Sequence, residues 1–282
     1  MTAPAAYFRP DTPEAALAHL AQGACRIAAG CTDLFAATER KVLPGPVLDI
    51  TGIAALRGIT RTVAGLRIGA TTTWTDLIRA DLPAACTGLQ QAAREVGAKQ
   101  IQNRGTIAGN LCNASPAADG VPPLLTLDAQ IEIASVGTTR VVPLSEFLTG
   151  PRQTVLTPRE MVTAVLIPAA ALAGRGQFLK LGARQYLVIS IAMSAARIVI
   201  QDGIVTQAAL AIGACGPVAT RLPKVERTLL GRPLDLSLIT DADVAAALRP
   251  MDDMRASAAF RMISAAELLR RTVAAPAQEA LT

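Results

Sequence analysis

The sequence predicts an α+β fold in two parts, residues 1 to about 171 and residues from about 175 to 282. The first 55 or so residues alternate helix and strand patterns, which is typical of a small parallel α/β layer. Short apolar runs separated by turn residues follow as far as Pro168, as in an antiparallel sheet with helices. The stretch Ala169–Gly176 resembles a linker, and strand and then helix patterns follow it.

In the first layer, Asp11, Thr12 and Pro13 indicate a helix start, because Asp and Thr cap helices and Pro suits the first helical position. The elements expected after this start are a helix over Glu14–Ala21, a strand over Cys25–Ala29, a turn over Gly30–Asp33, a helix over Leu34–Lys41 and a strand over Val47–Ile50.

The layer from about residue 56 to 171 is predicted to hold short strands, two helices and one long Gly/Asn-rich loop over Gly97–Asn113. The expected strands are Leu56–Ile59, Thr62–Val63, Leu66–Ile68, Leu124–Thr126, Gln130–Ala134, Thr139–Val142 and Val162–Ile167. The expected helices are Thr73–Arg79 and Leu89–Val96.

The second part is predicted to be a three-stranded antiparallel meander followed by a bundle of helices. Asp202-Gly203 is the expected hairpin turn between the second and third strands. The strands are expected at Gln177–Leu181, Ala195–Gln201 and Val205–Ile212, and the helices at Pro223–Leu230, Thr240–Leu248 and Ala256–Ala274.

Composition narrows the class of protein. Hydrophobic residues make up 51% and charged residues 17%, which is ample for a core and unlike a disordered chain. The net charge is +5, but Lys and Arg are scattered and aromatics are only 3%, unlike a nucleic-acid-binding stripe. The five cysteines match no zinc or iron–sulfur ligand spacing. We expect no membrane span, no metal site, and a cytoplasmic protein with reduced thiols.

A first candidate loop stands where a buried strand ends. It consists of Ala28, Ala29, Gly30, Cys31, Thr32, Asp33 and Leu34. Small residues let a backbone approach a ligand closely, and N–H groups at a helix start suit a phosphate. Asp33 suits helix capping better than phosphate contact, because its charge is negative. An ordinary strand–helix turn explains the same residues, and the two interpretations both stand at this point.

A second candidate loop is Arg104–Asn110, which continues through small and polar residues to Gly120. Its glycines at 105 and 109 allow the backbone to turn toward a ligand. The stretch matches neither the Rossmann fingerprint nor a Walker P-loop. A turn-rich connection is the plain alternative, but long loops in compact domains are often functional.

The stretch Gln102–Gly120, QNRGTIAGNLCNASPAADG, resembles the signature of the FAD-binding subunits of molybdenum hydroxylases, the xanthine dehydrogenase family. The first loop resembles that family's A-G-G-T-D type, although Cys31 and Ala108 depart from its usual residues. Val47–Gly58 and Phe178–Ala195 are similar to two further family segments, so that the resemblance spans almost the whole chain.

The resemblance implies a bilobed PCMH-type FAD-binding domain over 1–171, with lobes 1–55 and 56–171, and a C-terminal α+β domain over 175–282. It implies that backbone N–H groups of Ala28–Leu34 approach the FAD pyrophosphate. The further residues that it assigns to FAD are Thr106, Ile107, Gly109 and Asn110 on the other side of the cofactor, Ser115 and Asp119 at hydroxyls or phosphate, Val96 and Val162 near the ring system, and Lys180 near the isoalloxazine.

The resemblance assigns no catalytic acid, base or metal ligand to this chain. Tyr186 is expected either to lie against the flavin or to make a structural contact between domains. His19, the only histidine, lies in the first predicted helix, so attachment of the flavin through it is not expected.

The implied reaction is electron transfer by FAD in a heterotrimeric complex. A subunit with a molybdenum cofactor would oxidise the substrate, a [2Fe–2S] subunit would pass electrons to this FAD, and NAD or another acceptor would receive them. Two alternatives stay open: a self-sufficient flavin oxidoreductase of the vanillyl-alcohol-oxidase type, and a scaffold subunit without FAD.

Overall fold

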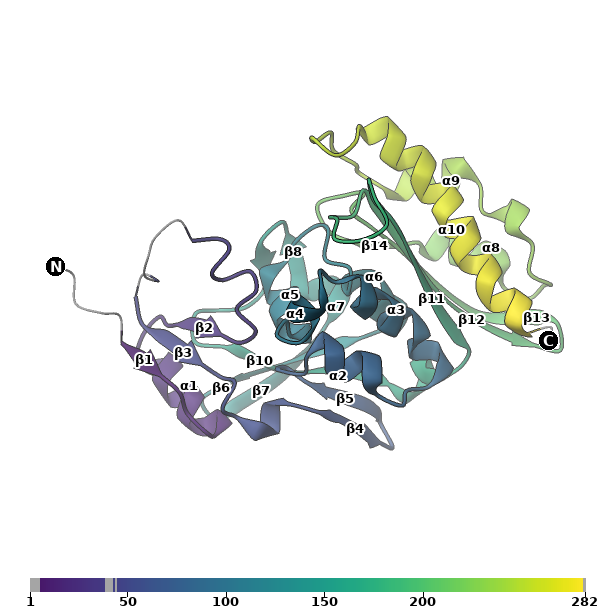
Figure 1. The fold of residues 1–282 in the computed structure, drawn as a ribbon. Coiled ribbons are helices and arrows are strands. Elements are labelled where there is room, and N and C mark those ends of the chain that lie inside the picture. Colours follow the sequence, from purple (N-terminus) through teal and green to yellow (C-terminus); the bar gives the residue numbers. More distant parts are fainter. Residues whose placement is uncertain (1–5, 39–42, 44, 281–282) are drawn as a thin grey trace.

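The computed structural model describes residues 6–38, 43 and 45–280 of the 282-residue chain. Two α/β lobes are followed by a C-terminal sheet whose one face is covered by a long helix (Figure 1). The small first lobe is a parallel sheet in the order β1-β3-β2, against which α1 packs. Its elements are β1 (Tyr7–Phe8), α1 (Pro13–Gln22), β2 (Arg26–Ala28) and β3 (Val47–Asp49).

The start of α1 follows from its sequence. The Thr12 hydroxyl accepts a hydrogen bond from the N–H of Ala15, and Pro13 occupies the first helical position, as predicted. The helix expected over Leu34–Lys41 is wrong in its described part. Residues 32–37 form a run of turns, and residues 39–42 lie outside the described part of the chain.

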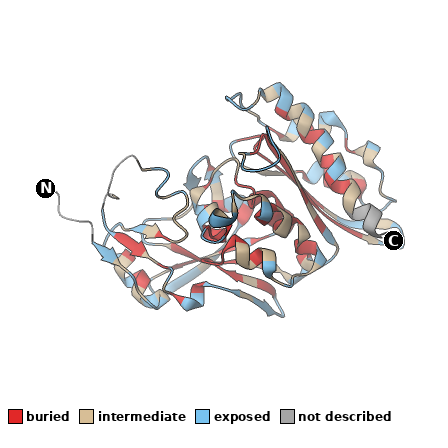
Figure 2. Ribbon diagram, viewed as in Figure 1, coloured by how far each residue is buried: buried red, intermediate tan, exposed pale blue. Residues whose placement is uncertain are grey.

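The second lobe is a five-stranded antiparallel sheet in the order β4-β5-β10-β6-β7. Its helices cover one face of the sheet, and buried residues concentrate between the two (Figure 2). The strands are β4 (Ile59–Thr62), β5 (Gly65–Gly69), β6 (Gln130–Ser135), β7 (Thr138–Pro143) and β10 (Met161–Pro168), with a separate hairpin of β8 (Leu148–Gly150) and β9 (Gln153–Thr154). The α-helices are α2 (Trp74–Arg79), α3 (Thr87–Glu95), α4 (Lys99–Gln102), α5 (Ile107–Asn113), α6 (Val121–Thr126) and α7 (Leu144–Phe147), and the 3-10 helices are Ala54–Leu56, Ala84–Cys86 and Ala169–Leu172.

Two predictions in this lobe are wrong for physical reasons. The strand expected at Leu124–Thr126 is the end of α6, whose residues are all buried. A fully buried apolar run looks the same in a strand and in a helix, but here two prolines open a helix. The Gly/Asn-rich stretch Gly97–Asn113 is also not one loop. It contains α4 and α5, and Thr106 caps α5 by accepting a hydrogen bond from the N–H of Gly109.

The C-terminal sheet has the order β11-β12-β13-β14 and is antiparallel throughout. The prediction of three strands is therefore one short, because Thr220–Arg221 adds a two-residue strand beside β13. Asp202 and Gly203 both have positive φ, as their predicted hairpin turn requires. The elements are β11 (Arg175–Leu181), β12 (Ala192–Gln201), β13 (Ile204–Gly213), β14 (Thr220–Arg221), α8 (Pro223–Leu229), a 3-10 helix (Leu236–Leu238), α9 (Asp241–Ala247) and α10 (Ala258–Ala280).

The backbone of the C-terminal sheet packs directly against the backbone of the second lobe. A Cβ on Gly176 in β11 would stand 2.1 Å from the carbonyl oxygen of Ala85, so only glycine fits there. Phe178 of β11 and Ala92 of α3 are buried in the same interdomain cluster. The expected linker Ala169–Gly176 is accordingly ordered, with a 3-10 helix at its start and β11 from Arg175.

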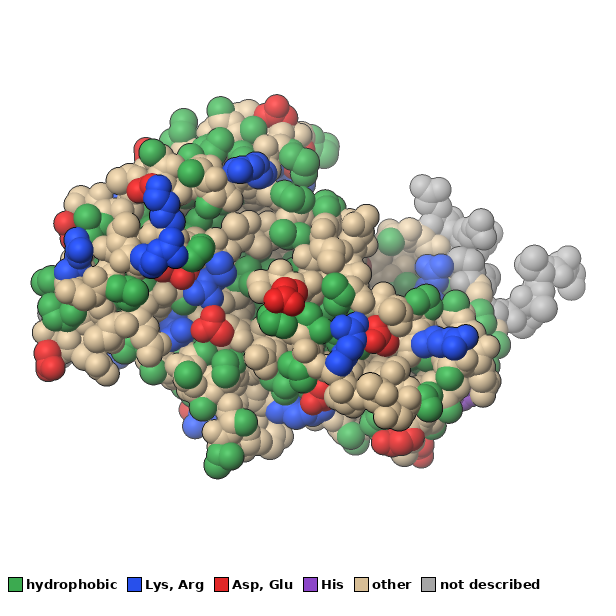
Figure 3. All heavy atoms as spheres, turned by 180° about the vertical axis from the view of Figure 1, so that it is seen from behind, with side chains coloured by type: hydrophobic (Ala, Val, Ile, Leu, Met, Phe, Trp, Pro, Cys, Tyr) green, Lys and Arg blue, Asp and Glu red, His purple; other side chains and the backbone are tan. Residues whose placement is uncertain are grey.

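The surface is mixed in charge. On the face drawn in Figure 3, Lys and Arg side chains stand among Asp and Glu side chains without a large patch of one sign. Among the described residues, no helix combines the length and apolarity needed to cross a bilayer.

Candidate functional site

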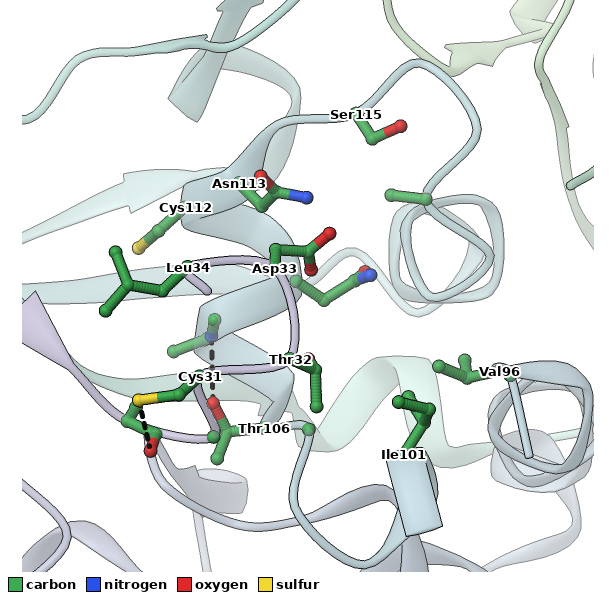
Figure 4. Close-up of a pocket in the computed structure, with 18 of the residues that line it drawn as sticks. Cys31, Thr32, Asp33, Leu34, Val96, Ile101, Thr106, Cys112, Asn113 and Ser115 are labelled. Carbon is green, nitrogen blue, oxygen red and sulfur yellow. Dashed lines mark hydrogen bonds between the residues drawn. The ribbon is translucent and has the colours of Figure 1, made fainter. Parts of the chain in front are cut away.

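A cavity of about 1230 Å³ lies where the two lobes and the C-terminal domain meet. Sites for small molecules usually have volumes of about 300–1,000 Å³, so this cavity suits a large ligand. It is lined by the turn after β2, the start of α5, the loop that follows α5, the strands β10 and β11, and the loop before β12. Figure 4 shows Thr32 and Asp33 on one side of this space and Val96 and Ile101 on the other.

The structure brings the predicted site residues together at this cavity, with two exceptions. Ala28 belongs to β2, where it is buried and its carbonyl accepts a hydrogen bond from the N–H of Ile50. Ile107 is fully buried in the core of the second lobe. The predicted residues that line the cavity are Ala29, Gly30, Cys31, Thr32, Asp33, Leu34, Val96, Thr106, Gly109, Asn110, Ser115, Asp119, Val162 and Lys180.

The first loop presents unused backbone donors. Within the described part of the chain, none of the N–H groups of Gly30 through Leu34 donates a hydrogen bond to another residue. Cys31 has φ of 61°, in the left-handed region, and such a residue within a turn gathers successive N–H groups into an anion-binding concavity. The turn alone provides this arrangement, because the described residues 32–37 form no helix for Asp33 to cap.

The Cys31 thiol points away from the open part of the cavity (Figure 4) and lies 3.4 Å from the carbonyl oxygen of Ala29. Partial burial raises the pKa of this thiol, and the nearby charge of Asp49 adds to the rise. Cys31 therefore contributes its backbone to the loop, with a protonated thiol at neutral pH.

The two loops touch through their backbones. A Cβ on Gly30 would stand 2.1 Å from the carbonyl oxygen of Arg104 and 2.9 Å from the Cα of Gly105. Real Cβ atoms essentially never come within 3.0 Å of another heavy atom, so no side chain can be added at residue 30 without moving one loop. The absence of a side chain at Gly30 is what lets the loops converge on one cavity.

The second loop differs, because its backbone N–H groups, apart from that of Thr106, already donate hydrogen bonds within the fold. The N–H of Ile107 donates to the carbonyl of Thr72 at 3.0 Å, and the N–H of Ala108 donates to that of Ala70 at 3.2 Å. The N–H of Asn110 donates to the carbonyl of Thr106 at 3.0 Å. These bonds fix the start of α5 against the sheet, so it offers a ligand shape and side chains rather than a row of N–H groups.

Asn110 is the clearest of these side chains. Its Oδ1 is buried and has no hydrogen-bond partner within the described chain. Buried polar atoms are nearly always paired, so an unpaired one in a cavity wall marks a place for a ligand or water. Thr106, whose own N–H is unpaired among the described residues, stands one turn before it in the same wall.

A buried ion pair closes the C-terminal side of the cavity. The Lys180 Nζ lies 2.7 Å from the Asp119 Oδ2, and each side chain is only 8% exposed. The hydroxyl of Ser190, fully buried, donates to the Asp119 Oδ1 at 2.6 Å. Desolvation raises the pKa of Asp119, and the charge of Lys180 and the two hydrogen bonds oppose that rise.

Sequence reasoning missed Arg152, a residue of the cavity wall, and Ser190, which supports the wall from behind. Ser190 reaches Asp119 across 71 positions, and no motif indicates that contact. Arg152, on the β8–β9 hairpin, lines the cavity and donates to the carbonyl of Asn113 at 3.1 Å. Its position depends on the register of a short hairpin, which the sequence does not reveal.

Tyr186 does not line the cavity in which the flavin is expected. Its side chain is 64% exposed and lies outside the cavity lining, which its neighbours Leu187, Val188 and Ile189 provide. His19 stacks on Phe8 in the first lobe with ring centroids 4.3 Å apart, and it does not line the cavity.

The sequence matches two known protein families that together cover most of the chain. The family described as the FAD binding domain in molybdopterin dehydrogenase matches residues 3–170, more than half of the chain. The chain belongs to this family. The family described as the CO dehydrogenase flavoprotein C-terminal domain matches residues 177–275.

Individual relatives agree with the family. The chain is 35% identical over 226 residues to the putative xanthine dehydrogenase FAD-binding subunit of Escherichia coli (strain K12), covering 77% of this chain and 76% of that protein. It is 34% identical to the nicotinate dehydrogenase FAD-subunit of Eubacterium barkeri, over 74% of this chain and 73% of that protein. Its fold matches a chain of reconstituted CO dehydrogenase from Oligotropha carboxidovorans with a TM-score of 0.91 and 26% identity, covering 98% of each chain.

The predicted family is thereby confirmed, and the chain is a flavoprotein subunit of the oxidoreductase class with FAD as its cofactor. Three features of the cavity fit that cofactor. Its volume suits a large ligand, its first loop has unpaired N–H groups for a pyrophosphate, and the start of α5 contributes the unpaired Asn110 oxygen to its lining.

Proposed function

We propose that this chain is the electron-transfer subunit of a xanthine dehydrogenase-like complex. It would receive electrons from a [2Fe–2S] subunit, which is itself supplied by a subunit with a molybdenum cofactor, and pass them to NAD or another acceptor. Bound FAD supplies the chemistry, because a flavin can accept single electrons and release a pair. The relatives described above are named as FAD subunits of dehydrogenases, which supports the assignment.

In this proposal residues 1–171 form the FAD-binding domain and residues 175–282 the C-terminal domain. The matched stretches, 3–170 and 177–275, support boundaries near these positions. The single observation that carries the site is that the unpaired N–H groups from Gly30 to Leu34 and the unpaired oxygen of Asn110 belong to residues that line one cavity.

The first loop would hold the pyrophosphate through these N–H groups, since an anion satisfies several donors at once. Thr106, Gly109 and Asn110 would hold the other side of the cofactor. Ser115 would offer its hydroxyl to the ribityl chain or a phosphate. Two predicted contacts are not part of this proposal, because Ala28 and Ile107 do not line the cavity.

Lys180 would stand near the isoalloxazine, with Val96 and Val162 on the apolar walls. Its ammonium has three N–H donors, of which one binds Asp119 at 2.7 Å and a second makes a long contact of 3.5 Å to the carbonyl of Glu95. Because Asp119 offsets the positive charge, Lys180 would act mainly as an oriented hydrogen-bond donor. Asp119 would fix that orientation while Ser190 holds its second oxygen.

The absorbance spectrum of the purified full chain tests the cofactor. We expect a flavin spectrum with one FAD per chain, whereas a colourless chain would support the scaffold alternative. Purification with candidate iron–sulfur and molybdenum subunits tests the complex. A yellow chain that stays alone and oxidises a small molecule unaided would support the vanillyl-alcohol-oxidase type.

Reduction of the bound flavin by NADH in a stopped-flow experiment tests the acceptor. Rapid bleaching by NADH would support NAD as the acceptor, because hydride transfer is reversible. Absence of bleaching, in a chain that still accepts electrons from its iron–sulfur partner, would assign another acceptor.

A further inference from the structure

Arg261, near the start of α10, is buried away from the cavity. The residue is 2% exposed, and its guanidinium donates hydrogen bonds to three groups. Its Nη1 donates to the carbonyl oxygens of Ile191 and Ala214, the second at 2.9 Å, and its Nη2 donates to the Asp253 Oδ1 at 2.6 Å. A buried arginine on two carbonyls and one carboxylate is a rigid fork, because its donors are coplanar.

The Ile191 carbonyl lies next to the residue that supports the Lys180–Asp119 ion pair. Ile191 follows Ser190, whose hydroxyl donates to Asp119 at 2.6 Å. The N–H of Ile191 donates to the carbonyl of Leu181 at 2.8 Å, next to Lys180. Holding the backbone of Ile191 therefore holds the end of the loop that carries Leu187–Ile189 into the cavity, and ties it to Leu181 at the loop's start.

The other carbonyl leads to the loop after α5. The N–H of Ala214 donates to the carbonyl of Pro116 at 3.1 Å. Pro116 lies between Ser115 and Ala117, which both line the cavity. One guanidinium thus holds, each through a single intervening residue, the two segments that form the C-terminal wall.

We propose that Arg261 is a positioning residue for the flavin site, which it shapes from behind by fixing the segments of Ser190 and Pro116 relative to each other. The proposal rests on the proposed function, since it assumes that FAD occupies this cavity. Arg261 would touch neither the cofactor nor the reacting atoms. Its effect would pass through Ser190 to Asp119 and so to Lys180.

A second buried arginine separates this role from ordinary structural support. Arg197 is 4% exposed and also joins the C-terminal sheet to the second lobe. Its Nε donates to the carbonyl of Thr126 at 2.8 Å, and its other nitrogens donate to Gln207 and Asp128. None of these partners lines the cavity, so Arg197 differs from Arg261 in location. The two are alike in burial and in donating to main-chain and carboxylate oxygens, although the Nε of Arg261 has no partner in the described chain.

The test compares Arg261→Lys with Arg197→Lys in the full chain. Lysine keeps the charge but loses the fork, so each variant loses hydrogen bonds to buried acceptors. The readouts are the FAD dissociation constant from titration of the deflavinated chain, the visible circular dichroism of bound flavin, and the melting temperature without FAD.

We expect Arg261→Lys to weaken FAD binding about tenfold, the equivalent of losing one hydrogen bond from the Lys180 ammonium to the cofactor, and to change the flavin dichroism. Arg197→Lys should lower the melting temperature comparably yet leave FAD affinity within about twofold. Equal FAD affinities in the two variants would overturn the proposal. A wild-type chain that binds no FAD would instead overturn the proposed function itself, and this inference with it.

If the arginine variants do not fold, two less disruptive serine variants test the proposed route from Ser190 to the flavin site. Ser190→Ala removes the hydroxyl that binds Asp119, and Ser194→Ala removes a buried hydroxyl that has no partner in the described chain. Both serines are fully buried. We expect only Ser190→Ala to weaken FAD binding and alter the flavin dichroism, and equal behaviour of the two variants would overturn the proposed route.

Discussion

The two loops of the cavity contribute in opposite ways. In the loop Ala29–Leu34, the N–H groups from Gly30 onward are unpaired within the described chain, so the ligand site is made of backbone. In the loop Arg104–Asn110, the N–H groups of Ile107 to Asn110 bind the fold itself, so that what remains for a ligand is side chains and shape. The more distinctive sequence motif thus belongs to the second loop, whose N–H groups mostly bond within the fold. The less distinctive motif belongs to the first loop, whose N–H groups are unpaired.

Each loop depends on different neighbours for its position. The first loop depends on the second, because Gly30 rests on the backbone of Arg104 and Gly105. The second loop is held by the sheet and, through Asp119, by the C-terminal domain. Substitutions that alter the space beside the backbone, the charge of a side chain or the conformation of a loop should therefore affect stability and FAD affinity to different extents.

The largest expected effect concerns Asp119, the buried carboxylate in the segment that follows the second loop. Lys180→Met leaves Asp119 buried without its cation, which should destabilise the chain by about 3–5 kcal/mol. Lys180→Met combined with Asp119→Asn removes both charges and should recover most of that loss. Denaturant unfolding of the deflavinated chain measures both. A double variant no more stable than the single would contradict a buried, mutually dependent pair.

The next effect tests the contact between the loops. Gly30→Ala places a Cβ against the Arg104 carbonyl, and overpacking of this kind costs about 1–3 kcal/mol, so FAD affinity should fall about 10- to 100-fold. Gly23→Ala is the control, because a Cβ there meets nothing within 4 Å. FAD titration measures both variants. Equal affinity for the two would mean that the loops need not touch to form the site.

Gly109→Asp probes the second loop alone. The carboxylate would stand in the cavity wall near the proposed cofactor, and we expect about a tenfold or greater loss of FAD affinity from like-charge repulsion. Gly109→Ala adds bulk without charge, with its Cβ facing only the Thr106 side chain, and should lose less. Retention of stoichiometric FAD in Gly109→Asp would remove this loop from the site.

The smallest effect concerns the conformation of the first loop. Cys31 adopts φ of 61°, which glycine adopts freely, so Cys31→Gly should retain FAD and change the free energy of unfolding by less than about 1 kcal/mol. Cys31→Val should bind FAD more weakly than Cys31→Gly, because a β-branched residue resists this conformation. The flavin content of the purified variants decides the question. Loss of FAD in Cys31→Gly would show that the thiol, rather than the backbone, matters.

The sequence predicts much of this fold where local signals agree with tertiary contacts. The start of α1 at Thr12 and Pro13 and the turn at Asp202-Gly203 depend on neighbouring residues alone, and both are as predicted. The helices α5 and α6 were not predicted. Glycines, asparagines and prolines favour loops locally, while burial of Ile107 and Leu124 decides for helix only in the folded chain.

The candidate site was predicted residue by residue through a motif, and the motif could not distinguish cavity residues from the supports behind them. Ile107 lies inside the motif but packs into the core, and Ala28 completes β2. Ser190 and Arg261 lie far from it in sequence and approach the cavity only because the C-terminal sheet packs on the second lobe. Contacts of that kind depend on tertiary packing, which no local pattern encodes.

Hydrogen exchange with and without FAD tests the central claim most directly, that the backbone of the first loop holds the cofactor while that of the second is committed to the fold. The amides of residues 30–34 should exchange rapidly in the deflavinated chain and become protected when FAD binds. The amides of residues 107–110 should be protected in both states. FAD binding that leaves the exchange of residues 30–34 unchanged would contradict this account.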